Sequence, residues 1–138
     1  MKIYREMVRS TSMGIRAIDN VMRYVENDAL GGTMKEQKKA LEEYCSRAKS
    51  ELSEKEVSEA EGSKFSQTMI KASSAISAMV NSDSSHLSRM LIEGYEMGIV
   101  SLQKCINEMQ NKQKEVPAAA KELIKFYDKS IKTLRTYL

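Results

Sequence analysis

Residues 12–25 read SMGIRAIDNVMRYV, and residues 96–109 read EMGIVSLQKCINEM. The triplet Met-Gly-Ile begins at position 13 in the first stretch and at position 97 in the second, an offset of 84 residues. Apolar positions continue in step after the triplet, and the matched pairs are Ile18 with Leu102, Val21 with Cys105, Met22 with Ile106 and Val25 with Met109. We interpret the two stretches as one type of helix used twice, which predicts a duplicated helical hairpin.

The composition favours an all-α protein. The chain has 138 residues, of which only 6 are glycine and 1 is proline, and helix-forming residues are abundant. This length suits one domain with its own apolar core, so we expect residues 1–138 to form a single helical-bundle domain. The 10 methionines are interpreted as flexible filling of that core.

The first hairpin is predicted over residues 3–54. Apolar residues at helical spacing predict its first helix over residues 3–29. Gly31 and Gly32 are expected to end this helix, because glycine readily adopts the left-handed conformation at a helix C-terminus. Thr33 is then the expected N-cap of the second helix, with Glu36 completing a capping box.

The second hairpin is predicted over residues 85–138. Its first helix is expected over residues 85–114, and Pro117 marks the start of the last helix, because proline is favoured in the first turn. The last helix repeats the second one at an offset of 82 residues. The matched pairs are Leu41 with Leu123, Tyr44 with Phe126 and Leu52 with Leu134.

Residues 55–84 are predicted to connect the two hairpins. The polar segment 53–62, SEKEVSEAEG, is interpreted as a frayed helix end and a linker. A further helix is expected over residues 63–81, where apolar residues at helical spacing are Phe65, Met69, Ala72, Ile76 and Met79. With alternating helix directions, this order predicts a ferritin-like antiparallel four-helix bundle, built from two duplicated helical hairpins with an extra helix in the crossover.

Small residues predict a close helix crossing. Gly94 and Gly98 lie four residues apart on one face of the predicted helix 85–114, and Gly14 is the equivalent of Gly98 in the first helix. Glycine inside a helix is unfavourable by about 1 kcal/mol relative to alanine, so it often marks a place where another backbone comes close. We predict that Gly14 and Gly98 form the paired contact between these two helices.

The sequence does not supply the ligands of a ferritin-like di-metal site, which needs inward glutamates and two Glu-x-x-His pairs. The single histidine, His86, lies at a predicted helix start, and Glu26 and Glu93 are the most nearly inward carboxylates. Cys45 and Cys105 lie on apolar stripes, and neither has a histidine near it along the sequence, so no nucleophile with a base is predicted. We therefore predict no catalytic residue, no cofactor, and no metal ligand beyond the candidates Glu26 and Glu93.

Charge and hydropathy restrict the kinds of partner. The net charge is +3, from 22 basic and 19 acidic residues that are mixed along the chain, so no concentrated basic stripe for nucleic acid is predicted. No apolar run is long enough to span a membrane, and the first residues lack the apolar core of a signal peptide. We therefore expect a cytoplasmic protein whose partner is another protein or a second copy of itself in a homodimer.

Three stretches resemble a group of small ferritin-like proteins of anaerobic Gram-positive bacteria. They are MGIRAIDNVMRYV near the start, HLSRMLIEGYEMGIVSLQKCINEM in the second half and LRTYL at the end. The resemblance implies a ferritin-like fold and no established activity. The chain departs from the family pattern at Phe65, where that group has a tryptophan in the crossover, and at residues 126–128, where it has a pair of glutamates.

Three functions are compatible with these patterns. The first is a non-enzymatic bundle that acts as a protein-interaction or scaffold module, through an apolar patch expected on helix 63–81 or on the last helix. The second is a degenerate ferritin-like metalloprotein with carboxylate ligands. The third is a small-ligand carrier, with a cavity between helices opened by small residues such as Gly94 and Gly98. Tyr24, Tyr95 and Tyr127 are expected to place their rings in the bundle and their hydroxyls in water.

Overall fold

The computed structural model describes residues 1–62 and 83–138 of the chain. The described residues form helices and connecting loops, without a strand. The helices are α1 (Lys2–Met22), α2 (Asp28–Lys49), α3 (Glu54–Ala60), α5 (Ser84–Asn111) and α6 (Ala118–Arg135). The all-α prediction is therefore confirmed for this part of the chain, whereas the helix predicted over residues 63–81 lies outside the described residues.

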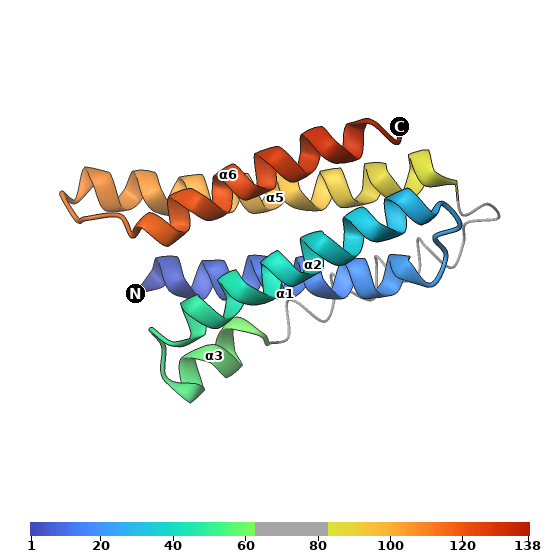
Figure 1. Cartoon of the computed structure of the whole chain (residues 1–138). Helices are drawn as coiled ribbons and strands as arrows, with labels where there is room; N and C mark the ends of the chain where they lie inside the picture. Colours follow the sequence, from blue (N-terminus) through green and yellow to red (C-terminus); the bar gives the residue numbers. More distant parts are fainter. Residues whose placement is uncertain (63–82) are drawn as a thin grey trace.

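The four long helices form two hairpins that pack against each other. Helix α1 pairs with α2 and α5 pairs with α6, while α1 also lies beside α5 and α2 beside α6. Figure 1 shows that α1 and α6 run in one direction along the bundle and that α2 and α5 run in the other. The N-terminus and the C-terminus consequently lie at opposite ends of the bundle (Figure 1).

One apolar face of each long helix is buried in a common core. The largest fully buried apolar side chains are Ile3, Met7, Val8, Ile18, Leu30, Met34, Leu41, Leu87, Leu102, Leu123, Leu134 and the ring of Tyr127. Together with the other buried residues of the same helices, they form one stripe along each helix, which is the amphipathic pattern that predicted the hairpins. The remaining faces carry the charged residues, so burial of this stripe stabilises the association of the helices.

The loop between α1 and α2 lies at residues 23–27, and the predicted end of the first helix at Gly31 and Gly32 is wrong. Asn27 is the N-cap of α2, and its side chain accepts a hydrogen bond from the Leu30 backbone N–H at 3.0 Å. Both glycines lie inside α2. Asparagine is among the strongest N-cap residues, and a helix start at this point buries Leu30 fully, which offsets the unfavourable glycines.

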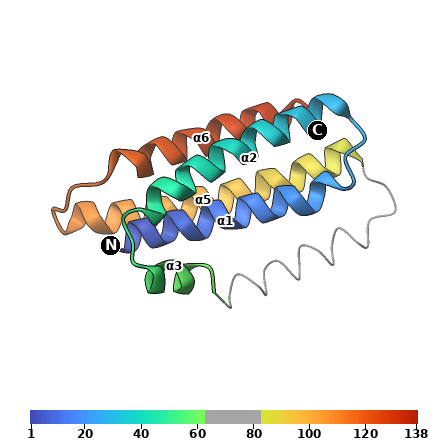
Figure 2. The same ribbon diagram turned by 60° about the horizontal axis from the view of Figure 1, so that its bottom comes forward.

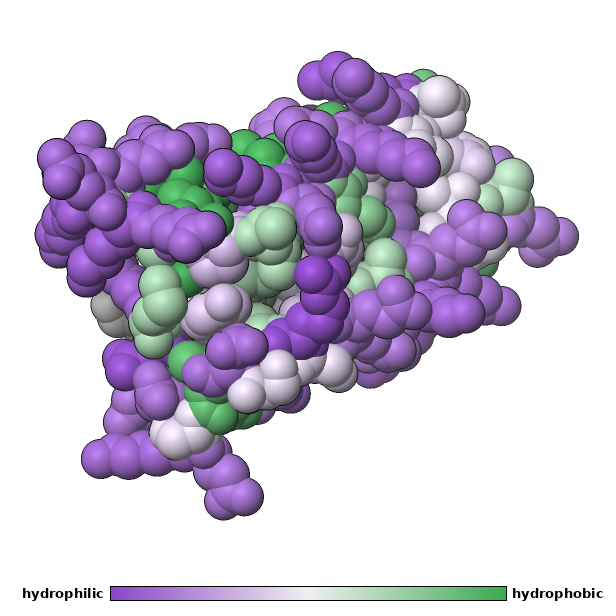
Figure 3. Space-filling view, turned by 60° about the vertical axis from the view of Figure 1, so that its left-hand side comes forward, coloured by the Kyte–Doolittle hydropathy of each residue, from purple (hydrophilic) through white to green (hydrophobic). Residues whose placement is uncertain are grey.

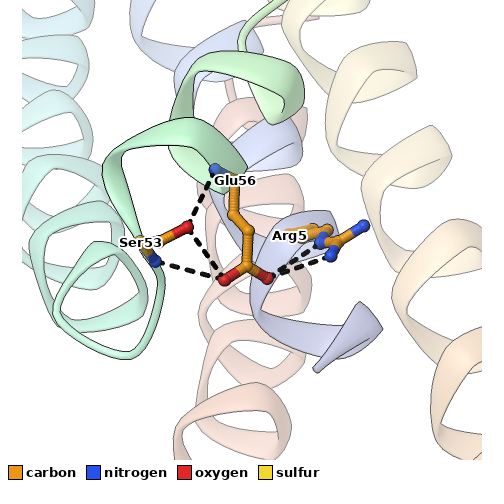
Figure 4. Close-up of polar contacts among 3 residues, drawn as sticks. All are labelled: Arg5, Ser53 and Glu56. Atoms are coloured by element: carbon orange, nitrogen blue, oxygen red, sulfur yellow. Dashed lines mark hydrogen bonds and ion pairs between the residues drawn. The ribbon is translucent and has the colours of Figure 1, made fainter.

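Residues 53–62 include a short helix, α3, where a frayed end and linker were predicted. Ser53 and Glu56 form a capping box, and Glu56 also accepts hydrogen bonds from the Arg5 side chain of α1, the shortest at 3.0 Å (Figure 4). Glu61 forms an ion pair with Lys49 of α2 at 2.9 Å, and Ala60 is buried. These contacts hold α3 against the first hairpin.

Candidate functional site

Two buried tyrosines form polar contacts at the centre of the bundle. The Tyr95 hydroxyl of α5 donates a hydrogen bond to Gln37 Oε1 of α2 at 2.8 Å. The Tyr127 hydroxyl of α6 shares a hydrogen bond of 2.5 Å with Ser10 Oγ of α1. The two rings lie 5.2 Å apart between their centroids, so one connected group of side chains joins all four long helices.

Burial keeps both tyrosines in their neutral form. It raises the pKa of the Tyr95 and Tyr127 phenols well above the ordinary value, mainly because the charged form would lose its hydration. The expectation that their hydroxyls would lie in water is wrong, since both side chains are buried. Each of the two tyrosine hydroxyls is paired with a side chain of another helix, an arrangement that fixes the relative position of the helices.

The three glycines of the predicted helix crossing have different surroundings. A β-carbon at Gly98 would lie 2.7 Å from Ser10 Oγ and 2.8 Å from Tyr127 Cε2, whereas one at Gly14 would lie 3.0 Å from Leu41 Cδ1. The predicted pairing of Gly14 with Gly98 is therefore wrong, because Gly14 faces α2. A β-carbon at Gly94 would meet nothing within 4 Å, so none of the described helices makes the predicted close contact at Gly94.

The two carboxylates named as candidate metal ligands do not face the centre. Glu26 is exposed in the loop between α1 and α2, and Glu93 is exposed on α5, where it forms an ion pair with Arg89 at 3.2 Å. Within residues 1–62 and 83–138, no three histidine, cysteine or acidic side chains lie close enough together to hold a metal ion. The description of Glu26 and Glu93 as nearly inward is consequently wrong.

Both cysteines are unpaired and buried. Ser12 Oγ lies 3.7 Å from Cys45 Sγ. Burial raises the pKa of the Cys105 thiol, which disfavours the reactive thiolate. The cysteines therefore contribute to the core as small apolar residues.

The outer face of α5 exposes two large apolar side chains. Met97 is 60% exposed and Val100 is 69% exposed, and they lie three residues apart on the same helix. The other large exposed apolar residues of the described chain lie at its ends or in a loop, at Met1, Leu138 and Tyr24. Polar residues cover most of the molecular face in Figure 3, with apolar residues in patches between them. Of the two places predicted for an apolar surface, residues 63–81 lie outside the described residues, and the exposed apolar side chains described on a long helix lie on α5.

The outer face of α6 carries lysines. Lys121, Lys125, Lys129 and Lys132 are exposed and follow helical spacing, so they lie on one side of the helix. Residues 118–138 contain five basic and two acidic residues, a net charge of +3 that equals the charge of the whole chain. This stripe was not predicted, because charge was considered as runs of adjacent residues, whereas these lysines are spaced four, four and three residues apart.

Comparisons with known protein families, with curated proteins and with solved structures find no match to this chain. The described helices are each too short or too polar to cross a membrane. The structure therefore defines a small all-helical protein, without a family assignment.

Proposed function

We propose that this protein is a non-enzymatic interaction module, which binds another protein chain through the outer face of α5. The observation that supports this function is the exposure of Met97 and Val100 on one helix. Adjacent exposed apolar side chains rimmed by polar residues are typical of protein-binding surfaces. The rim is supplied by the charged residues Glu93 and Lys104, which are both exposed.

We also propose a ferritin-like origin by duplication of a helical hairpin. Helix order and direction support it, because two antiparallel hairpins run up, down, down and up in the bundle (Figure 1). Buried positions of α1 and α5 also match at the offset of 84 residues. The matched buried pairs are Ile3 with Leu87, Met7 with Leu91, Val8 with Ile92, Thr11 with Tyr95, Ile18 with Leu102 and Val21 with Cys105.

The contacts of the described residues favour an interaction module over the two other functions. The space beside Gly98 is filled by Ser10 and Tyr127, so this glycine does not open a cavity for a small ligand. Glu26 and Glu93 are exposed, and a site built from them would lie outside the bundle.

A photo-crosslinking experiment tests the proposed surface. Benzoylphenylalanine is placed at Gln103, which is exposed beside Val100, and irradiated in the cells that produce the protein. We expect one defined adduct with another protein chain, and its loss when Met97 and Val100 are both changed to serine. The same probe at Lys129 on α6 is the control and should give no such adduct.

Two results would contradict the proposal. A probe at position 103 that reacts within its own chain only would show that the outer face of α5 is covered internally. An adduct that persists in the Met97→Ser, Val100→Ser variant would show that these apolar side chains do not bind the partner.

A further inference from the structure

The outer face of α5 has an ordered chemical pattern. Glu93, Met97, Val100 and Lys104 are all exposed, and their spacing of four, three and four residues places them along one side of the helix. The order along this seam is acidic, apolar, apolar, basic. Spacing of this kind is what two packed helices use at their contact.

The pattern is complementary to itself when two copies run antiparallel. In an antiparallel pair of identical helices, the residue numbers of two facing positions add up to a constant. If Met97 faces Val100 of the other copy, this sum is 197. The same register places Glu93 opposite Lys104, because their numbers have the same sum. Opposite charges then meet at both ends of an apolar centre. In a parallel pair, Glu93 would instead face Glu93 of the other copy, and Lys104 would face Lys104.

The surroundings of the seam permit this contact. Gly94 has open space where a side chain would be, and in the antiparallel register it faces Gln103 of the other copy. Glu93 pairs with Arg89 in the same helix at 3.2 Å, with both side chains more than half exposed. A pair of this kind contributes little stability, so Glu93 can exchange it for a contact with Lys104.

We propose that the partner of α5 is a second copy of this chain, held by an antiparallel two-fold contact between the seams formed by Glu93, Met97, Val100 and Lys104. The contact is isologous, since each residue meets the complementary residue of the other copy and no surface is left to extend the assembly. This inference rests on the proposed function, because it names the protein chain that the outer face of α5 binds.

Sedimentation equilibrium of charge-exchanged variants tests the inference. The wild-type protein should dimerise in a concentration-dependent way. Lys104→Glu alone and Glu93→Lys alone should each weaken dimerisation by about tenfold or more, because like charges would then face each other twice in the dimer. The double variant Glu93→Lys, Lys104→Glu should recover most of the wild-type affinity. Lys129→Glu makes the same charge change on α6 and should leave dimerisation unchanged.

Helix content by circular dichroism is recorded for every variant, so that loss of the fold is recognised. A wild-type protein that stays monomeric overturns the inference, and so does a charge exchange that fails to recover dimerisation in a folded variant. A monomer that still gives the crosslink from position 103 to a different protein would overturn this inference alone and leave the proposed function standing.

Discussion

Gly94 and Gly98 show how differently one residue type can act within a single turn of helix. Gly98 lies where Ser10 of α1 and Tyr127 of α6 leave no room for a β-carbon, whereas Gly94 faces open space. The sequence presents the two glycines as equivalent. Their difference arises from packing, so it belongs to the folded molecule and not to helix propensity.

Alanine substitutions should separate these two environments. Gly94→Ala should stabilise the protein by about 1 kcal/mol, because alanine is the better helix former and meets no obstacle. Gly98→Ala should destabilise it by about 1–3 kcal/mol, because the new methyl group would overpack the contact with Ser10 and Tyr127. Urea denaturation of the two variants and the wild type measures both changes. Equal stabilisation by both substitutions would show that α1 and α6 do not approach Gly98 closely.

The polar contacts at the centre could not be predicted from the sequence. Tyr95 and Gln37 are 58 residues apart, and Ser10 and Tyr127 are 117 apart. Periodicity correctly assigns these positions to helices, but it does not give the rotation and height of one helix relative to another. Those quantities decide which hydroxyl meets which acceptor.

At the scale of the element, α3 depends on one carboxylate. Glu56 accepts hydrogen bonds from the Ser53 backbone and side chain and from Arg5 (Figure 4). These contacts lower the pKa of Glu56, the Ser53 backbone N–H being the largest cause and Arg5 the next. The ionised carboxylate therefore both caps α3 and attaches it to α1.

Protonation of Glu56 should loosen α3. Because its pKa is lower in the folded protein than in the unfolded chain, the stabilisation is present above the ordinary glutamate pKa of about 4.3 and is lost as the pH falls below it. Backbone chemical shifts of α3, followed by NMR during acid titration, should move toward unfolded values before those of α1. Glu56→Ala should show the same loosening at neutral pH, and the exposed neighbour Glu59→Ala is the matched control. Identical α3 shifts in the two variants would contradict the role of Glu56.

The start of the second hairpin was predicted to within one residue. Helix α5 begins at Ser84, next to the predicted start, and Asp83 caps it through the Ser85 backbone N–H. The first loop was misplaced because the pair Gly31–Gly32 was preferred to Asn27 as the boundary signal. Helix α3 was missed although Ser53-x-x-Glu56 is a capping-box sequence, because the surrounding charges were interpreted as a linker.

At the scale of the whole molecule, the buried tyrosines link stability to alkaline pH. The native state retains the protons of Tyr95 and Tyr127, because burial raises both pKa values, whereas the unfolded chain releases them above a pH of about 10. The free energy of unfolding should therefore decrease as the pH rises through that value, by about 1.4 kcal/mol per buried tyrosine at a pH of about 11.

Tyr127→Phe isolates this effect from the other groups that titrate at alkaline pH. The variant should be less stable than the wild type at neutral pH, because it loses the hydrogen bond with Ser10. It should, however, lose less stability than the wild type between a pH of about 9 and 11. Urea denaturation across this range gives the comparison. Parallel pH profiles for the two proteins would mean that the Tyr127 hydroxyl is accessible to water in the folded state.

The global arrangement was predictable to the level of two helical hairpins. The amphipathic stripes that include Ile18 and Leu102 predicted the long helices, and short loops predicted antiparallel neighbours. The distribution of charge was not predicted, because the net charge of +3 does not show that four exposed lysines lie on one side of α6. Contact between the hairpins through Ser10, Gly98 and Tyr127 also required the three-dimensional structure.

The two chain ends lie at opposite ends of the bundle (Figure 1), so the bundle separates whatever is attached to them. Helix α1 starts at one end of the bundle and α6 finishes at the other (Figure 1). The longest helix, α5, has 28 residues, which corresponds to a rod of about 40 Å. Two fused domains or two fluorescent labels attached to the first and last residues would therefore be held apart by a distance of this order. The bundle would act as a rigid spacer between them.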